Sequence, residues 1–163
     1  MNEAAPQILV ALEASGAGQA IRQSVWIYPA ANVAHVVALA VFAGAVAVMD
    51  LRLLGAFAAT RPADVIIPAR RFAIAGLSLL ALTGAVLFTA EASHVALNPV
   101  LQLKAALIAL GIANALLLGR VPEATLARIA PHVPLPARVR GAAMLSLAIW
   151  LSVAACGRLI AYF

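Results

Sequence analysis

Four long apolar segments, at residues 32–55, 72–91, 99–119 and 141–163, alternate with more polar ones along this chain. In the first of them, residues 33–49 carry no formal charge. A helix rises 1.5 Å per residue, so about 20 apolar residues cover the roughly 30 Å hydrocarbon core of a bilayer. The pattern predicts an all-α fold: an integral membrane four-helix bundle, formed as a single domain by residues 1–163.

The segments outside the four spans carry turn signals and polar residues. Residues 4–25 mix apolar side chains with Glu13 and Arg22, which predicts a short N-terminal helix at the membrane interface. Trp26 and Tyr28 are expected at the headgroup level, with Pro29 breaking the chain before the first span. Residues 56–71 and 120–140, rich in arginine and proline, are predicted to be loops, and 91–99 a return turn.

Composition supports the membrane interpretation. The chain is 65% hydrophobic and 10% charged, whereas soluble domains are about 45–50% apolar and 25% charged. The net charge of +5 does not indicate a nucleic-acid partner, because the cations lie between apolar segments rather than on one basic face. The one cysteine, Cys156, rules out an intramolecular disulfide.

The positions of the cations predict an orientation. Eight of the eleven lie on the side of the two basic loops: Arg52, Arg61, Arg70, Arg71, Arg120, Arg128, Arg138 and Arg140. Arg22, Lys104 and Arg158 lie on the side of the termini. By the positive-inside rule, the loops are cytoplasmic and both termini are periplasmic.

Ionisable residues are predicted to gather in the outer layer of this bundle: His35, Glu91 and His94, Lys104, and Arg158, one group from each span or its turn. Because polar groups cost free energy in lipid, such residues are candidate functional residues. Two neutral imidazoles, His35 and His94, are candidate metal ligands for a b-type haem or for copper. Lys104 and Arg158 are the expected partners of Glu91 or of an anionic ligand such as a haem propionate.

Each of these residues also has a structural interpretation. His35 can hydrogen-bond a neighbouring helix, and Lys104 and Arg158 can extend to the headgroups. His94 can be an ordinary loop residue. His132 is expected to be solvated, and Asp50 is expected to pair with an arginine from a neighbouring helix or loop.

Small residues predict close helix contacts. Gly76 and Gly84 are eight residues apart and therefore fall on nearly the same face of the second span. We expect that face to lie against another helix rather than lipid.

Several strings resemble a bacterial family of small four-helix membrane proteins: W-x-Y-P at 26–29, D-L-R-L-L-G at 50–55, N-P followed by Lys104, and G-R-L-I-A-Y at 157–162. The resemblance covers nearly the whole chain and implies no particular activity. The His35 helix and the later N-P helix with Lys104 are also distantly similar to copper-resistance protein D and to HemJ-type protoporphyrinogen oxidases. That similarity implies copper handling or haem-dependent oxidation, with His35 and Lys104 as the matching residues.

Three functions follow as hypotheses. The leading one is a multi-pass redox module of the bacterial inner membrane that binds haem b in its periplasmic half. The second, equally compatible with the sequence, is a subunit without a cofactor that docks into a larger membrane complex or a homo-oligomer. The third is copper handling.

Overall fold

The structure, a computed structural model, describes residues 5–118, 121–160 and 162, which form helices and no strand. The long helices are α3 (Ile27–Leu54), α4 (Pro62–Ala90), α6 (Pro99–Leu118) and α8 (Ala137–Leu159). The short ones are α1 (Gln7–Ala14), α2 (Gly16–Gln23), α5 (Ala92–Val95) and α7 (Glu123–Arg128). Each long helix contains an apolar stretch long enough to cross a membrane. The predicted all-α membrane bundle is confirmed.

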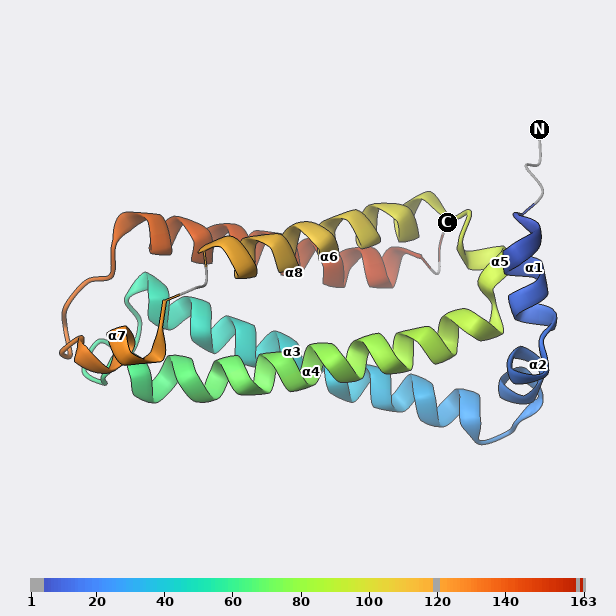
Figure 1. The fold of residues 1–163 in the computed structure, drawn as a ribbon, viewed down its shortest axis with the longest axis horizontal. Helices are drawn as coiled ribbons and strands as arrows, with labels where there is room; N and C mark the ends of the chain where they lie inside the picture. Colours follow the sequence, from blue (N-terminus) through green and yellow to red (C-terminus); the bar gives the residue numbers. More distant parts are fainter. Residues whose placement is uncertain (1–4, 119–120, 161, 163) are drawn as a thin grey trace.

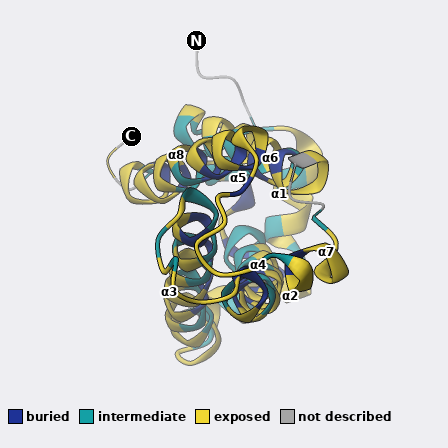
Figure 2. Cartoon of the chain, turned by 90° about the vertical axis from the view of Figure 1, so that its left-hand side faces the viewer, coloured by how far each residue is buried: buried dark blue, intermediate teal, exposed yellow. Residues whose placement is uncertain are grey.

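The four long helices form two antiparallel pairs (Figure 1). Helix α3 packs along α4, α6 packs along α8, and the two pairs meet mainly where α3 contacts α8. Helices α1, α2 and α5 lie together at one end of the bundle, hereafter the α1 end. Helix α7 and the turn between α3 and α4 lie at the opposite end, hereafter the α7 end. The buried residues are on the helix faces that turn toward one another, and the outer faces are exposed (Figure 2).

Trp150 on α8 occupies the centre of the bundle. Its ring meets the ring of Phe42 on α3 edge to face, with 4.6 Å between the ring centroids. On its other side it lies against Gly111 of α6, where a Cβ would come within 2.8 Å of the indole. Edge-to-face aromatic pairs are favourable beyond the area that they bury. Trp150 therefore connects three of the four long helices.

The prediction that Gly76 and Gly84 lie against a helix is confirmed. A Cβ at Gly76 would lie 3.0 Å from the Cβ of Phe42, and one at Gly84 would lie 3.4 Å from Cε1 of His35. Both neighbours are on α3. Helix α4 therefore approaches α3 through its small residues.

The first long helix begins earlier than its predicted span. Pro29 was expected to break the chain, but it lies in the first turn of α3, which starts at Ile27. Backbone N–H groups of the first turn have no partner within the helix, so proline removes nothing there. Pro29 is compatible with the start of this helix.

The predicted loop at 56–71 is wrong for its second half, because α4 begins at Pro62. Pro62 occupies the first turn, and Asp64 in the same turn is favourable at the positive end of the helix dipole. Pro68 lies inside the helix, which continues through Arg70 and Arg71. The cluster of prolines and charges that suggested a loop is instead the beginning of a helix.

The remaining boundaries differ in smaller ways. The single helix predicted within 4–25 is two short helices, α1 and α2, since Ser15 ends α1 and its side chain accepts from the N–H of Gly18 at the start of α2. The return turn contains α5, and the second basic segment contains α7. Helix α8 begins at Ala137, before the predicted 141. Residues 119, 161 and 163 of the predicted third and fourth spans lie outside the described residues.

Candidate cofactor site

His35 is fixed by a hydrogen bond between α3 and α4. Its Nδ1 lies 2.8 Å from Oγ1 of Thr83. The one hydroxyl proton of Thr83 is donated to the carbonyl oxygen of Leu79, 2.7 Å away and one turn earlier in α4. The hydroxyl oxygen is therefore the acceptor, and we assign the imidazole proton to Nδ1. The neutral ring then carries its free lone pair on Nε2.

The neighbouring residue, Gly84, leaves room for the imidazole. A Cβ at position 84 would contact Cε1 of His35 at 3.4 Å, closer than most such contacts. Thr83 is 8% exposed, so it offers His35 a partner that is shielded from solvent. Thr83 and Gly84 together set the orientation of the histidine ring on α3.

Lys104 on α6 lies near this histidine. Its side chain is half-buried and lies within electrostatic range of His35. A Cβ at Gly157 would lie 3.5 Å from its Nζ, so the ammonium group rests against α8. Among the described residues, no carboxylate forms an ion pair with it. A half-buried cation without a carboxylate is available to an anionic ligand.

The other two predicted site residues are at the α1 end and are exposed. His94 is on α5, and no side-chain hydrogen bond of its ring is recorded within the described residues. Arg158, in the last turn of α8, donates to the Tyr162 hydroxyl over 2.6 Å and lies 4.9 Å from the centroid of that ring. Glu91 accepts from the Tyr28 hydroxyl over 3.3 Å, so its recorded partner is not Lys104 or Arg158. Of the predicted site residues, the structure places His35 and Lys104 within electrostatic range of each other.

A buried polar group at Asp50 was only partly anticipated by the sequence. Asp50 on α3 is 1% exposed, and the side chain of Ser146 on α8 interacts with its carboxylate. The predicted pairing of Asp50 with an arginine is wrong: its Oδ2 has no hydrogen-bond partner, and the ion pair among the described residues joins Glu13 to Arg22. Arg52, two residues further along α3, donates instead to the Thr60 carbonyl over 2.8 Å. Asp50 faces Ser146 of α8 instead of an arginine from a neighbouring helix or loop, and Arg52 points to a different side of α3.

Asn114 is a second buried polar residue that the sequence analysis did not use. Its side-chain amide on α6 donates over 3.1 Å to the carbonyl of Ala142, one turn before Ser146 on α8. Its Oδ1 is buried without a partner among the described residues. Asp50 and Asn114 can be noticed in the sequence because they are polar residues inside predicted spans. Their partners depend on how the helices are aligned against one another.

The α1 end is held together by a polar network that the sequence analysis missed. Glu13 of α1 forms an ion pair with Arg22 of α2 at 2.7 Å and accepts hydrogen bonds from the backbone and side chain of Ser93. Arg22 also donates to the carbonyl of Ala90 at the end of α4. The hydrogen bonds from Ser93, followed by the charge of Arg22, lower the pKa of Glu13 below its usual value. These contacts fix the short helices against the bundle.

Fold and site define a class: a multi-pass membrane protein built from four apolar helices, with a few polar side chains buried among them. Residues 14–163 match the family of unknown function DUF6644, and the chain belongs to this family. Comparison with curated proteins and with solved structures gave no match. The distant similarity to copper-resistance protein D and HemJ-type proteins therefore has no support from these comparisons.

Proposed function

We propose that this protein is a small redox module of the bacterial inner membrane that binds one b-type haem through His35. The observation that carries the proposal is the hydrogen bond from His35 Nδ1 to Thr83, which leaves Nε2 as the free ligand atom. Histidines that bind metals commonly donate their other ring N–H to such a fixed acceptor. Bound haem would supply one-electron transfer at its iron.

The residues present fit haem better than a metal held by protein ligands only. No group of three His, Cys, Asp or Glu side chains within the described part of the chain is placed to hold a metal ion. The porphyrin itself provides four ligands to haem iron, so a single imidazole is a sufficient protein ligand. This ligand set favours haem over copper.

Lys104 is proposed to hold an anionic group of the cofactor. Its ammonium group is half-buried, lies within electrostatic range of His35 and has no carboxylate partner among the described residues. A haem propionate would provide the missing negative charge. Arg158 and His94 are exposed at the α1 end, and we propose them as a second anion partner and a second ligand, respectively.

The proposed orientation puts both termini in the periplasm. It is supported by the cations at the α7 end, which include Arg52, Arg61 and Arg140. A C-terminal alkaline phosphatase fusion is expected to be active, and a C-terminal green fluorescent fusion is expected to be dark. The opposite pair of results would reverse the orientation.

The test of haem binding is the absorption spectrum of detergent-purified protein expressed with a haem precursor. We expect a Soret band that sharpens on reduction, and its loss in His35→Ala. His132→Ala is the matched control, since this histidine lies at the α7 end, and it should keep full occupancy. Loss of the Soret band in His94→Ala would identify His94 as a second ligand, whereas its retention would indicate that His35 is the single histidine ligand. A wild-type protein without haem, or full occupancy in His35→Ala, would overturn the proposal.

A second candidate is a subunit without a cofactor in a larger complex or a homo-oligomer. The observation that favours it is the low burial of two helices. Within the apolar stretch that could cross the membrane, 11% of the residues are buried in α4 and in α6, against 28% in α3 and 33% in α8. Exposed apolar faces of this kind can pack against further helices as well as against lipid. Purification in a mild detergent with mass spectrometry of co-purifying chains tests it, and a colourless monomer would contradict both candidates.

A further inference from the structure

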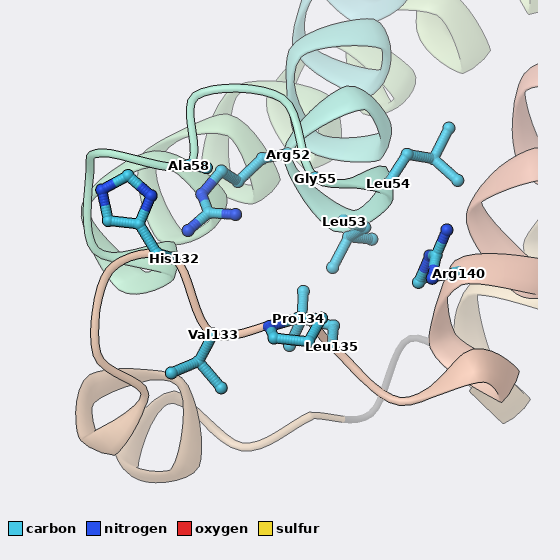
Figure 3. A pocket seen from close by; sticks show the side chains of 10 residues that line it. All are labelled: Arg52, Leu53, Leu54, Gly55, Ala58, His132, Val133, Pro134, Leu135 and Arg140. Atoms are coloured by element: carbon cyan, nitrogen blue, oxygen red, sulfur yellow. The ribbon is translucent and has the colours of Figure 1, made fainter.

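A pocket of about 260 Å³ opens at the α7 end, far from His35 along the bundle axis. It lies between the end of α3, the segment that follows α7 and the beginning of α8 (Figure 3). Ten residues line it: Arg52, Leu53, Leu54, Gly55, Ala58, His132, Val133, Pro134, Leu135 and Arg140. The space greatly exceeds the roughly 30 Å³ that one water occupies.

The polar side chains of this lining are basic. Arg52, His132 and Arg140 come from three different segments of the chain, and none of the ten lining residues is acidic. Neither arginine forms an ion pair with a described carboxylate. Figure 3 shows Arg52 and His132 on one side of the pocket and Arg140 on the other. Such an arrangement concentrates positive charge that an anion would neutralise.

Arg52 is the residue that points most directly to a ligand. It is 2% exposed, and its guanidinium group is directed into the space between His132 and Leu53 (Figure 3). One nitrogen donates to the Thr60 carbonyl over 2.8 Å, but Nε is buried without any hydrogen-bond partner among the described residues. Buried donors in native proteins are nearly always paired, and a guanidinium group pairs best with a planar or tetrahedral oxyanion.

Hydrogen bonds fix the backbone around the pocket. Gly55, with φ of 114°, caps α3: its N–H and that of Ala56 donate to the carbonyls of Arg52 and Leu51. His132 has φ of 64°, and its N–H donates to the Ala58 carbonyl over 2.7 Å, which ties the two loops together. Two carbonyls in the last turn of α3 therefore have donors, and α8 begins nearby with the positive end of its dipole.

From these contacts we propose that the pocket binds a phosphate group, with Arg52 as the buried donor and Arg140 and His132 at the rim. Arginine is suited to this role because its donors match two phosphate oxygens at once. The pocket lies where the α3 span ends and the α8 span begins, the depth of lipid headgroups. The phosphate can therefore belong to an anionic lipid or be free in solution.

The experiment uses the full chain, delipidated in a neutral detergent, and follows thermal unfolding. One arm adds inorganic phosphate against sodium chloride of equal ionic strength. The other adds short-chain phosphatidylglycerol against short-chain phosphatidylcholine. Ligands that bind the folded state raise its unfolding temperature, and the concentration dependence gives an apparent Kd. A rise in the lipid arm only identifies a headgroup, and a rise with inorganic phosphate identifies a free anion.

Matched variants separate a built site from general surface charge. Arg52→Gln and Arg140→Gln are expected to raise the apparent Kd by about tenfold or more. Arg138→Gln removes the same charge from the same turn of α8 but does not line the pocket, so its Kd should stay within about twofold of wild type. Arg140 is exposed, so Arg140→Gln tests the site even if Arg52→Gln does not fold. No rise in either arm, or equal weakening by Arg138→Gln, overturns the proposal.

Discussion

Gly76 on α4 lies directly against Phe42 on α3, so close that a Cβ at position 76 would stand 3.0 Å from both the Cβ and the backbone nitrogen of Phe42. Phe42 is itself buried and meets Trp150 on its other side. The aromatic pair can occupy the bundle centre because α4 has no side chain at this position. The packing of three helices therefore depends on one missing methyl group.

Substitution of Gly76 should reveal this contact. We expect Gly76→Ala to lower the free energy of unfolding by about 1–3 kcal/mol, since the added carbon meets backbone atoms that cannot move aside. Gly44→Ala is the control: a Cβ there meets nothing within 4 Å, so it should be neutral or stabilise by up to about 1 kcal/mol. Unfolding by denaturing detergent measures both variants, and equal stability of the two would contradict the packing.

Thr83 should control the protonation site of His35. Thr83→Val keeps the volume but removes the acceptor of the Nδ1–H, whereas Thr83→Ser retains it. Nitrogen NMR of the imidazole should show the Nδ1–H tautomer in wild type and Thr83→Ser, and a mixture in Thr83→Val. If haem binds, Thr83→Val should weaken it by roughly 10- to 100-fold. A single unchanged tautomer in Thr83→Val would show that another group orients the ring.

Asp50 should couple energetically to Ser146 rather than to Arg52. A double-mutant cycle of Asp50→Asn with Ser146→Ala is expected to give a coupling free energy of about 0.5–3 kcal/mol. The cycle of Asp50→Asn with Arg52→Gln should give less, because the recorded partner of Arg52 is the Thr60 carbonyl. A larger coupling free energy with Arg52 than with Ser146 would show that Asp50 and Arg52 interact along α3.

Glu13 should make the docking of α1 depend on pH. The pKa of Glu13 is lowered in the folded protein by Ser93 and then by Arg22, so its contribution to stability is present above the ordinary value of 4.5 and is lost as pH falls below it. Hydrogen exchange of α1 should therefore increase between pH 5 and pH 3 once corrected for the intrinsic rate. Ser93→Ala should reduce this dependence. Equal protection of α1 across that range would show that other contacts hold it.

The four apolar helices could be predicted because lipid requires long apolar segments with internally paired backbones. The starts of α3 and α4 could not be placed, because Pro29, Pro62 and Pro68 were interpreted as breakers. At the first turn of a helix a proline costs little, and the surrounding helix of α4 tolerates Pro68. A proline by itself does not distinguish a helix start from a helix end.

Residues of the candidate site could be predicted better than their contacts. A histidine and a lysine inside apolar segments are unusual enough to be noticed, and the structure brings His35 and Lys104 within electrostatic range. The partner Thr83 could not be predicted, since it depends on how α3 and α4 are rotated against each other. The same holds for Asp50 and Ser146, whose contact joins segments almost one hundred residues apart.

The contact between α3 and α8, with Phe42 and Trp150 at its centre, has a consequence for the order of folding. Each antiparallel pair forms from two successive long helices, so its contacts span a shorter stretch of chain than the contacts between α3 and α8. The contact between the two pairs cannot form until α8, the last long helix, has been synthesised. Contacts of such large sequence separation form late because chain closure is costly in entropy. We therefore expect the two hairpins to form first and their docking to be the last step of assembly.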